Sequence, residues 1–155
     1  MYDLLSGLRV IEGSAFVAAP LGGMTLAQLG AEVIRFDPVG GGMDHKRWPL
    51  DSKGNSLYWA GLNKGKKSIA VNAREIEGRE LIEAIICQPG PDNGIFLTNH
   101  PPGGPFSYDK LKSKRDDLIM VNVLGSYDGS PAVDYTINCA LGFPFATGPR
   151  GIDRP

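Results

Sequence analysis

The sequence has few cysteines and almost no net charge, and each shortage excludes a class of protein. Cys87 and Cys139 are too few for a disulfide framework or a cysteine zinc site, so we expect reduced thiols and no metal. The 16 Lys and Arg residues oppose 17 Asp and Glu residues, which gives a formal net charge of −1. Because no global positive field results, nucleic acid is not an expected partner.

Long apolar runs and secretion signals are missing as well. No stretch reaches about eighteen consecutive apolar residues, so the sequence predicts no membrane span. Residues 1–7, MYDLLSG, have neither the cationic start nor the apolar core of a signal peptide. We therefore expect a cytoplasmic protein that has no membrane partner.

Glycine and proline are plentiful, with 21 Gly and 12 Pro among 155 residues. Together they make up about a fifth of the chain, against an average of about 12%. This share is too small for a low-complexity chain, but it predicts an unusual amount of ordered loop. The apolar fraction of 42% and the charged fraction of 21% are typical of a soluble globular protein of about one domain.

Short apolar runs alternate with helical patterns along the first 123 residues. Compact apolar runs bounded by turn residues predict strands at 8–12, 31–36, 68–71, 95–98 and 118–123. Apolar residues at helical spacing predict helices at 21–29, 74–87 and 108–114, with a helical turn at 57–62. Strands joined through helices pair in parallel. The order therefore predicts an α/β fold with a Rossmann-like, doubly wound, mainly parallel sheet and flanking helices.

Beyond residue 124 the pattern weakens. Residues 134–140 are compatible with a helix, and we expect residues 143–155 to be irregular. No terminal helix follows to cover the sheet, and a compact domain rarely ends in this way. We therefore expect residues 1–155 to be the N-terminal part of a larger domain.

The turn after the first strand is one candidate ligand site, because parallel sheets bind ligands at the carboxyl ends of their strands. The dinucleotide fingerprint G-x-G-x-x-G is missing after Gly13. Asp37 does stand where a ribose-binding acid would follow the second strand. It is equally well placed to initiate a turn before Pro38. NAD binding is thus an alternative that rests on half a fingerprint.

A group of lysines forms a second candidate. Residues 64–67, KGKK, place three ammonium groups beside a flexible glycine. Such a cluster can hold a phosphate or a diphosphate. A solvated loop that leads into a strand explains it equally well.

Asp134 is a third candidate, because it precedes a stretch with helical pattern. An aspartate at this place is typical of an N-cap. His45 and His100 lie in separate loops, without the serine or cysteine motif that would make either one a triad base. Metal-ligand spacing is absent too. The residue patterns by themselves therefore predict no more than an α/β domain that binds a phosphorylated ligand.

Six blocks of sequence, in order and at familiar intervals, resemble one enzyme family: 7–12, 19–20, 29–37, 63–69, 98–99 and 117–119. Over essentially all 155 residues the chain resembles the N-terminal part of the family III CoA-transferases, the carnitine dehydratase and bile-acid-inducible group. The resemblance implies the large Rossmann-like CoA-binding and catalytic domain, without the small domain and the C-terminal return segment. It also implies a homodimer, because full-length members interlink in pairs.

The resemblance assigns Asp134 as the catalytic residue, since this aspartate and Gly142 match the family spacing. In the family the carboxylate attacks an acyl-CoA thioester, which gives a mixed anhydride and a CoA thiolate. A thiolate is a tolerable leaving group, because the pKa of a thiol is about 8.5. The expected substrates are an acyl-CoA and a carboxylic acid, with CoA as substrate and no permanently bound cofactor.

The CoA contacts implied by the resemblance lie in two loops. The turn Phe16, Val17 and Ala18 matches the segment that lines the pantetheine and thiol path. Asn99 and His100 match an Asn-aromatic pair near the nucleotide. The full set of cofactor-binding candidates adds the two residues that pattern singled out: Phe16, Val17, Ala18, Asp37, Lys66, Asn99 and His100.

Within the family, the segments 12–28, 36–42 and 46–48 look most like members that move CoA between the two carboxyls of one branched C5 dicarboxylic acid. A related racemase activity uses a histidine immediately before the matching aspartate. Val133 stands there in this chain, which argues against racemisation. The other alternative is a truncated, catalytically incompetent chain that at most binds CoA.

Overall fold

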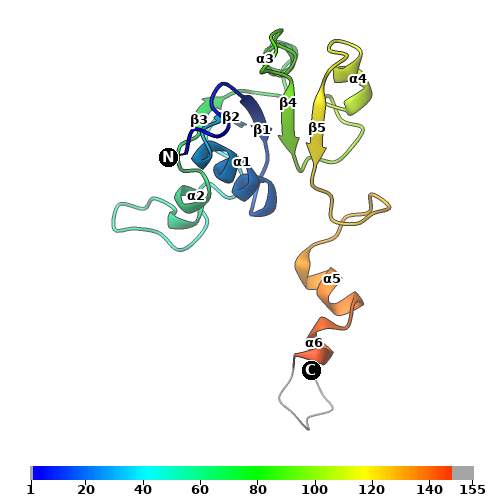
Figure 1. Ribbon diagram of the computed structural model, residues 1–155. Coiled ribbons are helices and arrows are strands. Elements are labelled where there is room, and N and C mark those ends of the chain that lie inside the picture. Colours follow the sequence, from blue (N-terminus) through cyan, green and yellow to red (C-terminus); the bar gives the residue numbers. More distant parts are fainter. Residues whose placement is uncertain (1, 148–155) are drawn as a thin grey trace. The chain divides into compact units, whose positions relative to one another are not determined.

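The computed structural model describes residues 2–147, and the chain divides after Val123 into two units. The first unit contains nine elements: β1 (Arg9–Gly13), α1 (Ala18–Gln28), β2 (Glu32–Asp37), α2 (Leu57–Leu62), β3 (Lys67–Ala70), α3 (Ile76–Ile86), β4 (Ile95–Thr98), α4 (Tyr108–Lys112) and β5 (Ile119–Asn122). The second unit contains α5 (Asp134–Ala140) and α6 (Phe143–Ala146) (Figure 1).

The first unit is built on a parallel sheet of five strands in the order β3-β2-β1-β4-β5 (Figure 1). Ile11 of the central strand β1 lies opposite Ile34 of β2 and Phe96 of β4. The chain runs from β1 outward through β2 and β3, then crosses to the other side for β4 and β5. This order confirms the predicted doubly wound α/β fold and places its topological switch point between β1 and β4.

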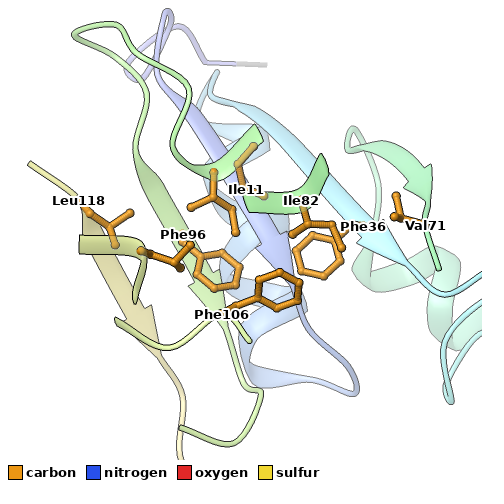
Figure 2. Close-up of a cluster of buried hydrophobic side chains, with 9 residues drawn as sticks. Ile11, Phe36, Val71, Ile82, Phe96, Phe106 and Leu118 are labelled. Atoms are coloured by element: carbon orange, nitrogen blue, oxygen red, sulfur yellow. The ribbon is translucent and has the colours of Figure 1, made fainter. Parts of the chain in front are cut away.

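One face of the sheet packs on α3 and α4 through large apolar side chains. Because successive strand residues point to opposite faces, Ile11, Phe36 and Phe96 share this side. The rings of Phe36 and Phe96 stack with their centroids 6.2 Å apart. Figure 2 shows this cluster with Ile82 from α3 and Phe106 beside it. These residues form the larger hydrophobic core.

The opposite face packs on α1, a helix rich in small residues. Val10, Val33 and Leu97 point from the strands toward Ala19 and Ala27 of the helix. Small side chains let the helix axis approach the sheet closely. On this face the next residues along β1 and β2 are charged, namely Glu12 and Arg35.

The second unit differs from the sequence prediction in one element. The helix predicted at 134–140 is present as α5, but residues 143–155 were expected to be irregular, and Phe143–Ala146 form the short helix α6. Pro144 lies in the first turn of α6, where its fixed φ favours a helix and its missing N–H has no cost. Residues 148–155 of that prediction lie outside the described residues. No helix among residues 2–147 has the length and apolarity to cross a membrane.

Candidate functional site

The loops that follow β1 and β4 meet at the switch point, where the two strands end side by side. Thr98 joins them, since its Oγ1 donates to the carbonyl of Gly13 at 2.7 Å and accepts from the N–H of His100 at 3.0 Å. Gly13 fits here for a steric reason, because a Cβ atom would lie 2.2 Å from the Phe36 ring. The end of β1 is therefore fixed between two neighbouring strands.

The turn Ser14–Ala18 leaves β1 in an unusual backbone conformation. Phe16 has a φ of 67°, which is in the left-handed region that non-glycine residues rarely adopt. Two side chains from other loops hold it. The N–H of Phe16 donates to Asp44 Oδ2 at 2.9 Å, and Asn99 exchanges two hydrogen bonds with the backbone of Ala15, at 3.0 and 2.9 Å. The turn is thus shaped by residues 28 and 84 positions away in the sequence.

The side chains of this turn face outward. Phe16 is 41% exposed and Val17 is 48% exposed, although both are apolar. Ala18 is also exposed and begins α1. The three residues predicted to line a thioester path therefore present an open apolar surface beside the end of β1.

A buried cluster of charges lies on the α1 face of the sheet and forms hydrogen bonds with Ser14, the first residue of the turn. Its centre is Arg35, which is 1% exposed and makes a two-bond pair with Asp37, each N···O distance being 2.8 Å. Arg35 also donates to Glu12 Oε1 at 3.2 Å and to the carbonyl of Ser14 at 2.8 Å. Burial opposes the charge of Arg35, but the carboxylates of Asp37, Glu12 and Asp44 together outweigh it and raise the pKa of the guanidinium.

Lys66 belongs to the same cluster and does not reach the surface. Its ammonium group donates to Glu12 Oε1 at 2.9 Å, to Asn63 Oδ1 at 2.8 Å and to the carbonyl of Pro20 at 2.8 Å. The side chain is 2% exposed, and burial lowers its pKa while Glu12 acts in the opposite direction. The chain's own acceptors therefore occupy all three N–H bonds of Lys66, and its contact with CoA remains a prediction.

Helix α1 rests directly on the carboxylate of Glu12. A Cβ atom on Gly23 would lie 1.8 Å from Glu12 Oε2, a carboxylate that Arg35 and Lys66 hold in place. We predict that Gly23→Ala lowers the free energy of unfolding by about 2–3 kcal/mol through overpacking. Gly61→Ala in α2 is the control, because nothing lies within 4 Å of a Cβ there. It should leave stability unchanged or raise it by up to about 1 kcal/mol. Urea unfolding measures both, and equal losses would contradict the prediction.

A cavity of about 540 Å³ opens at the carboxyl ends of the strands. Asp37 lines it, with both carboxylate oxygens already accepting from Arg35, and Arg74 and His100 border it. A second cavity of about 350 Å³ adjoins it and shares His100, Phe106 and Ala73. Its lining is largely apolar and rich in proline. Together the two cavities offer space for a ligand that has both polar and aromatic parts.

A larger opening of about 670 Å³ lies elsewhere, between residues 87–91 and 112–117. These segments precede β4 and β5, so the opening is at the amino ends of the strands. Ligands of doubly wound sheets bind at the carboxyl ends. The switch-point cavities are therefore the better candidate despite their smaller volume.

His100 stands where the two cavities meet, with its ring centroid 6.1 Å from that of Phe36. Burial lowers the pKa of the imidazole below 6.5, and the charge of Arg35 acts in the same direction. The folded state thus binds this proton less readily than the unfolded state. Its contribution to stability is complete above pH 6.5 and is lost as the pH falls through 6.5 toward the folded pKa.

We predict that acidification from about pH 7.5 to about pH 5.5 lowers the urea midpoint more in the wild-type chain than in His100→Gln. The glutamine carries no titrating proton, so the difference between the two chains isolates His100. Urea titrations at both pH values measure it. An identical pH dependence would contradict the prediction.

Asp134 lies in the second unit, as the first residue of α5. The N-cap is Val133, whose N–H donates to Thr136 Oγ1 at 3.1 Å. Asp134 is exposed, and within the described part of the chain no hydrogen bond involves its carboxylate. The N-cap interpretation of Asp134 is therefore wrong, because Val133 occupies the N-cap position and Asp134 is already inside the helix. The carboxylate remains available for chemistry.

The sequence patterns do not single out three members of the charge cluster, namely Glu12, Arg35 and Asp44. The first two stand inside apolar strands, and Asp44 lies in a glycine-rich loop. A usable signal exists, since a charged residue on the buried face of a central strand needs a partner. The identity of that partner depends on the fold.

Comparison with known proteins gives one consistent family. A profile of the family described as CoA-transferase family III matches residues 5–154. The chain is 64% identical over 151 residues to 2-methylfumaryl-CoA isomerase of Chloroflexus aurantiacus, covering 96% of this chain and 37% of that protein. It is 34% identical over 135 residues to succinyl-CoA–D-citramalate CoA-transferase of the same organism. That match covers 84% of this chain and 33% of the relative.

A solved structure agrees with the fold. The crystal structure of a CAIB/BAIF family protein from Brucella suis superposes with a TM-score of 0.84 at 28% identity. It covers 98% of this chain, which in turn covers 43% of that protein. The chain thus spans about a third of the length of these two curated relatives.

Proposed function

Since the chain belongs to CoA-transferase family III, we propose that it carries the CoA-binding and catalytic part of an enzyme that transfers CoA between carboxylic acids. The observation that supports this most is the turn Ser14–Ala18, which an acceptor from each of two distant loops holds beside the switch-point cavities. A ligand path built on a fixed backbone turn has little conformational entropy to lose on binding.

The nucleotide end of CoA is assigned to the two cavities that share His100 and Phe106. Aromatic and apolar walls suit the adenine ring, and Arg74 at the rim of the larger cavity suits a phosphate. Asp37 offers carboxylate lone pairs to a ribose hydroxyl from the same wall. Asn99 supports binding through the backbone of Ala15, to which its amide is tied.

The thiol end of CoA is assigned to the exposed side of Phe16, Val17 and Ala18. Apolar side chains that pack against the thioester arm reduce its contact with water and so favour its transfer over its hydrolysis. Lys66 and Arg35 contribute from beneath the turn by fixing Glu12 and the carbonyl of Ser14. Their part in binding is indirect.

Asp134 is proposed as the nucleophile. One carboxylate oxygen attacks the thioester carbonyl, the C–S bond breaks with its electron pair going to sulfur, and a mixed anhydride and a CoA thiolate result. The thiolate then attacks the aspartyl carbonyl of the anhydride, which frees the acid and leaves an aspartyl-CoA thioester. The acceptor carboxylate reverses these two steps and regenerates Asp134. Each step breaks one acyl C–S or C–O bond and forms another, so the oxidation states do not change and no redox partner is needed.

The substrate class is proposed from the relative with 64% identity. We assign a branched C5 dicarboxylic acid, with CoA moving between its own two carboxyls. A homodimer and a cytoplasmic location are proposed with it, together with a small domain and a return segment outside residues 1–155. The second candidate is a chain that binds CoA without turnover; the chain spans 37% of the length of that relative.

Incubation with 2-methylfumaryl-CoA tests the proposal. Liquid chromatography separates the two positional thioesters and follows their interconversion with time. Conversion that rises with protein concentration supports CoA transfer between the two carboxyls of one acid. Saturable CoA binding without conversion supports the second candidate, and the absence of both contradicts the proposed function.

A further inference from the structure

We infer that Asp44 is a positioning residue, which keeps the turn Ser14–Ala18 in the conformation that receives the thioester end of CoA. The inference rests on the proposed function, because that proposal places the thiol path on this turn. Asp44 follows β2 in a loop that pattern did not connect with the turn. Its side chain nevertheless reaches the backbone of Phe16.

The contact stands at the most strained point of the turn. Asp44 Oδ2 accepts the N–H of Phe16 at 2.9 Å, and Phe16 has the positive φ of 67°. An L residue returns to negative φ unless its surroundings hold it. Such a return would redirect the N–H and with it the side chains of Phe16 and Val17. Asn99 holds the neighbouring residue Ala15, but the acceptor at Asp44 is the side-chain contact that holds the N–H of Phe16 itself.

The carboxylate of Asp44 is buried, so its contacts are made inside the protein and not with solvent. The residue is 1% exposed, and its Oδ1 has no hydrogen-bond partner among the described residues. The nearest cation is Arg35, whose NH2 lies 3.7 Å from Oδ1. A Cβ on Gly42 would come within 3.3 Å of the same oxygen, so the loop encloses it closely. Arg35 thus balances the charge while the other oxygen holds Phe16.

The loop that carries Asp44 also holds the ring of Phe16. The guanidinium of Arg47 lies over the Phe16 ring, 5.6 Å from its centroid, and over the Tyr58 ring at 4.8 Å. Cations over aromatic faces are attracted to the ring electrons. The same loop therefore fixes the backbone of Phe16 through Asp44 and its side chain through Arg47.

Three variants test this role through two measurements. Asp44→Ala removes the acceptor, Asp44→Asn keeps an amide oxygen in the same place, and Asp51→Ala is the control. Asp51 is also a loop aspartate that accepts backbone N–H groups, but these belong to Lys53 and Asn55. The measurements are the hydrogen-exchange rate of the Phe16 amide by NMR and the dissociation constant for CoA.

We expect Asp44→Ala to speed exchange at Phe16 about a hundredfold or more, and to weaken CoA binding about tenfold or more. Asp44→Asn should stay within about fivefold of the wild type in both measurements, because its oxygen still accepts. Asp51→Ala should change neither. If Asp44→Ala does not fold, Asp44→Ser takes its place, since the shorter hydroxyl does not span the same distance.

The outcomes separate this inference from the proposed function. Unchanged exchange at Phe16 in Asp44→Ala overturns the positioning role, as do equal losses in the alanine and asparagine variants. Equal losses in Asp51→Ala overturn it too, because they indicate a general loosening of loops. A wild-type chain that does not bind CoA contradicts the proposed function, and the exchange rates then decide the role of Asp44 alone.

Discussion

Replacing Arg35 with methionine should lower the free energy of unfolding by about 3–5 kcal/mol. The guanidinium is buried among three carboxylates, those of Glu12, Asp37 and Asp44. Methionine fills much of the volume but leaves these groups without their shared cation, and an uncompensated buried charge is costly. Urea unfolding with linear extrapolation measures the loss.

Arg9→Met is the matched control for this prediction. Arg9 also joins β1 to β2, through Glu32, but both side chains are 30% exposed. A partly solvated pair contributes little, so the loss should stay below about 1 kcal/mol. Equal losses of unfolding free energy in Arg9→Met and Arg35→Met would contradict the prediction, because the buried cluster would then stabilise the fold no more than the partly exposed pair.

Replacing Asp134 with asparagine should reduce CoA transfer about a thousandfold or more, because an amide does not form the mixed anhydride. The affinity for CoA should change less than about threefold, since the proposed binding groups lie in the first unit. The interconversion of 2-methylfumaryl-CoA thioesters, followed by chromatography, gives the rate.

Asp128→Asn is the control in the same unit. Asp128 is an exposed loop carboxylate whose pKa is lowered to about 2 by hydrogen bonds from Ser130. It stays ionised at neutral pH, like a nucleophilic carboxylate, but has no proposed part in transfer. Its replacement should leave the rate within about threefold of the wild type. Unchanged turnover in Asp134→Asn would show that another group forms the covalent bond.

The fold follows from local sequence to a large extent. The strand at 95–98 was predicted to the residue, because the apolar run IFLT is bounded by glycine and asparagine. The α1 helix begins three residues before the predicted 21–29, since Pro20 suits a first helical turn and the alanines before it continue the pattern. Helix α6 was missed because four residues are too few to show a period.

The candidate site was less predictable, because its groups meet only through the sheet. Asp37 and Lys66 were selected as candidate ligands for ribose or phosphate, and no sequence pattern indicated that both also belong to the buried cluster around Arg35 and Glu12. Sequence spacing does not show which charges face each other across adjacent strands. Asp44 has no local signal at all, since its partner is a backbone N–H 28 residues earlier.

An NMR titration of the isotopically labelled chain with CoA tests most directly whether ligands bind at the switch point. The amides of residues 14–18, 37–43, 71–74 and 98–100 border the turn and the two cavities, and their signals should shift together along one saturation curve. Shifts confined to residues 87–91 and 112–117, which line the opening at the amino ends of the strands, would contradict this placement.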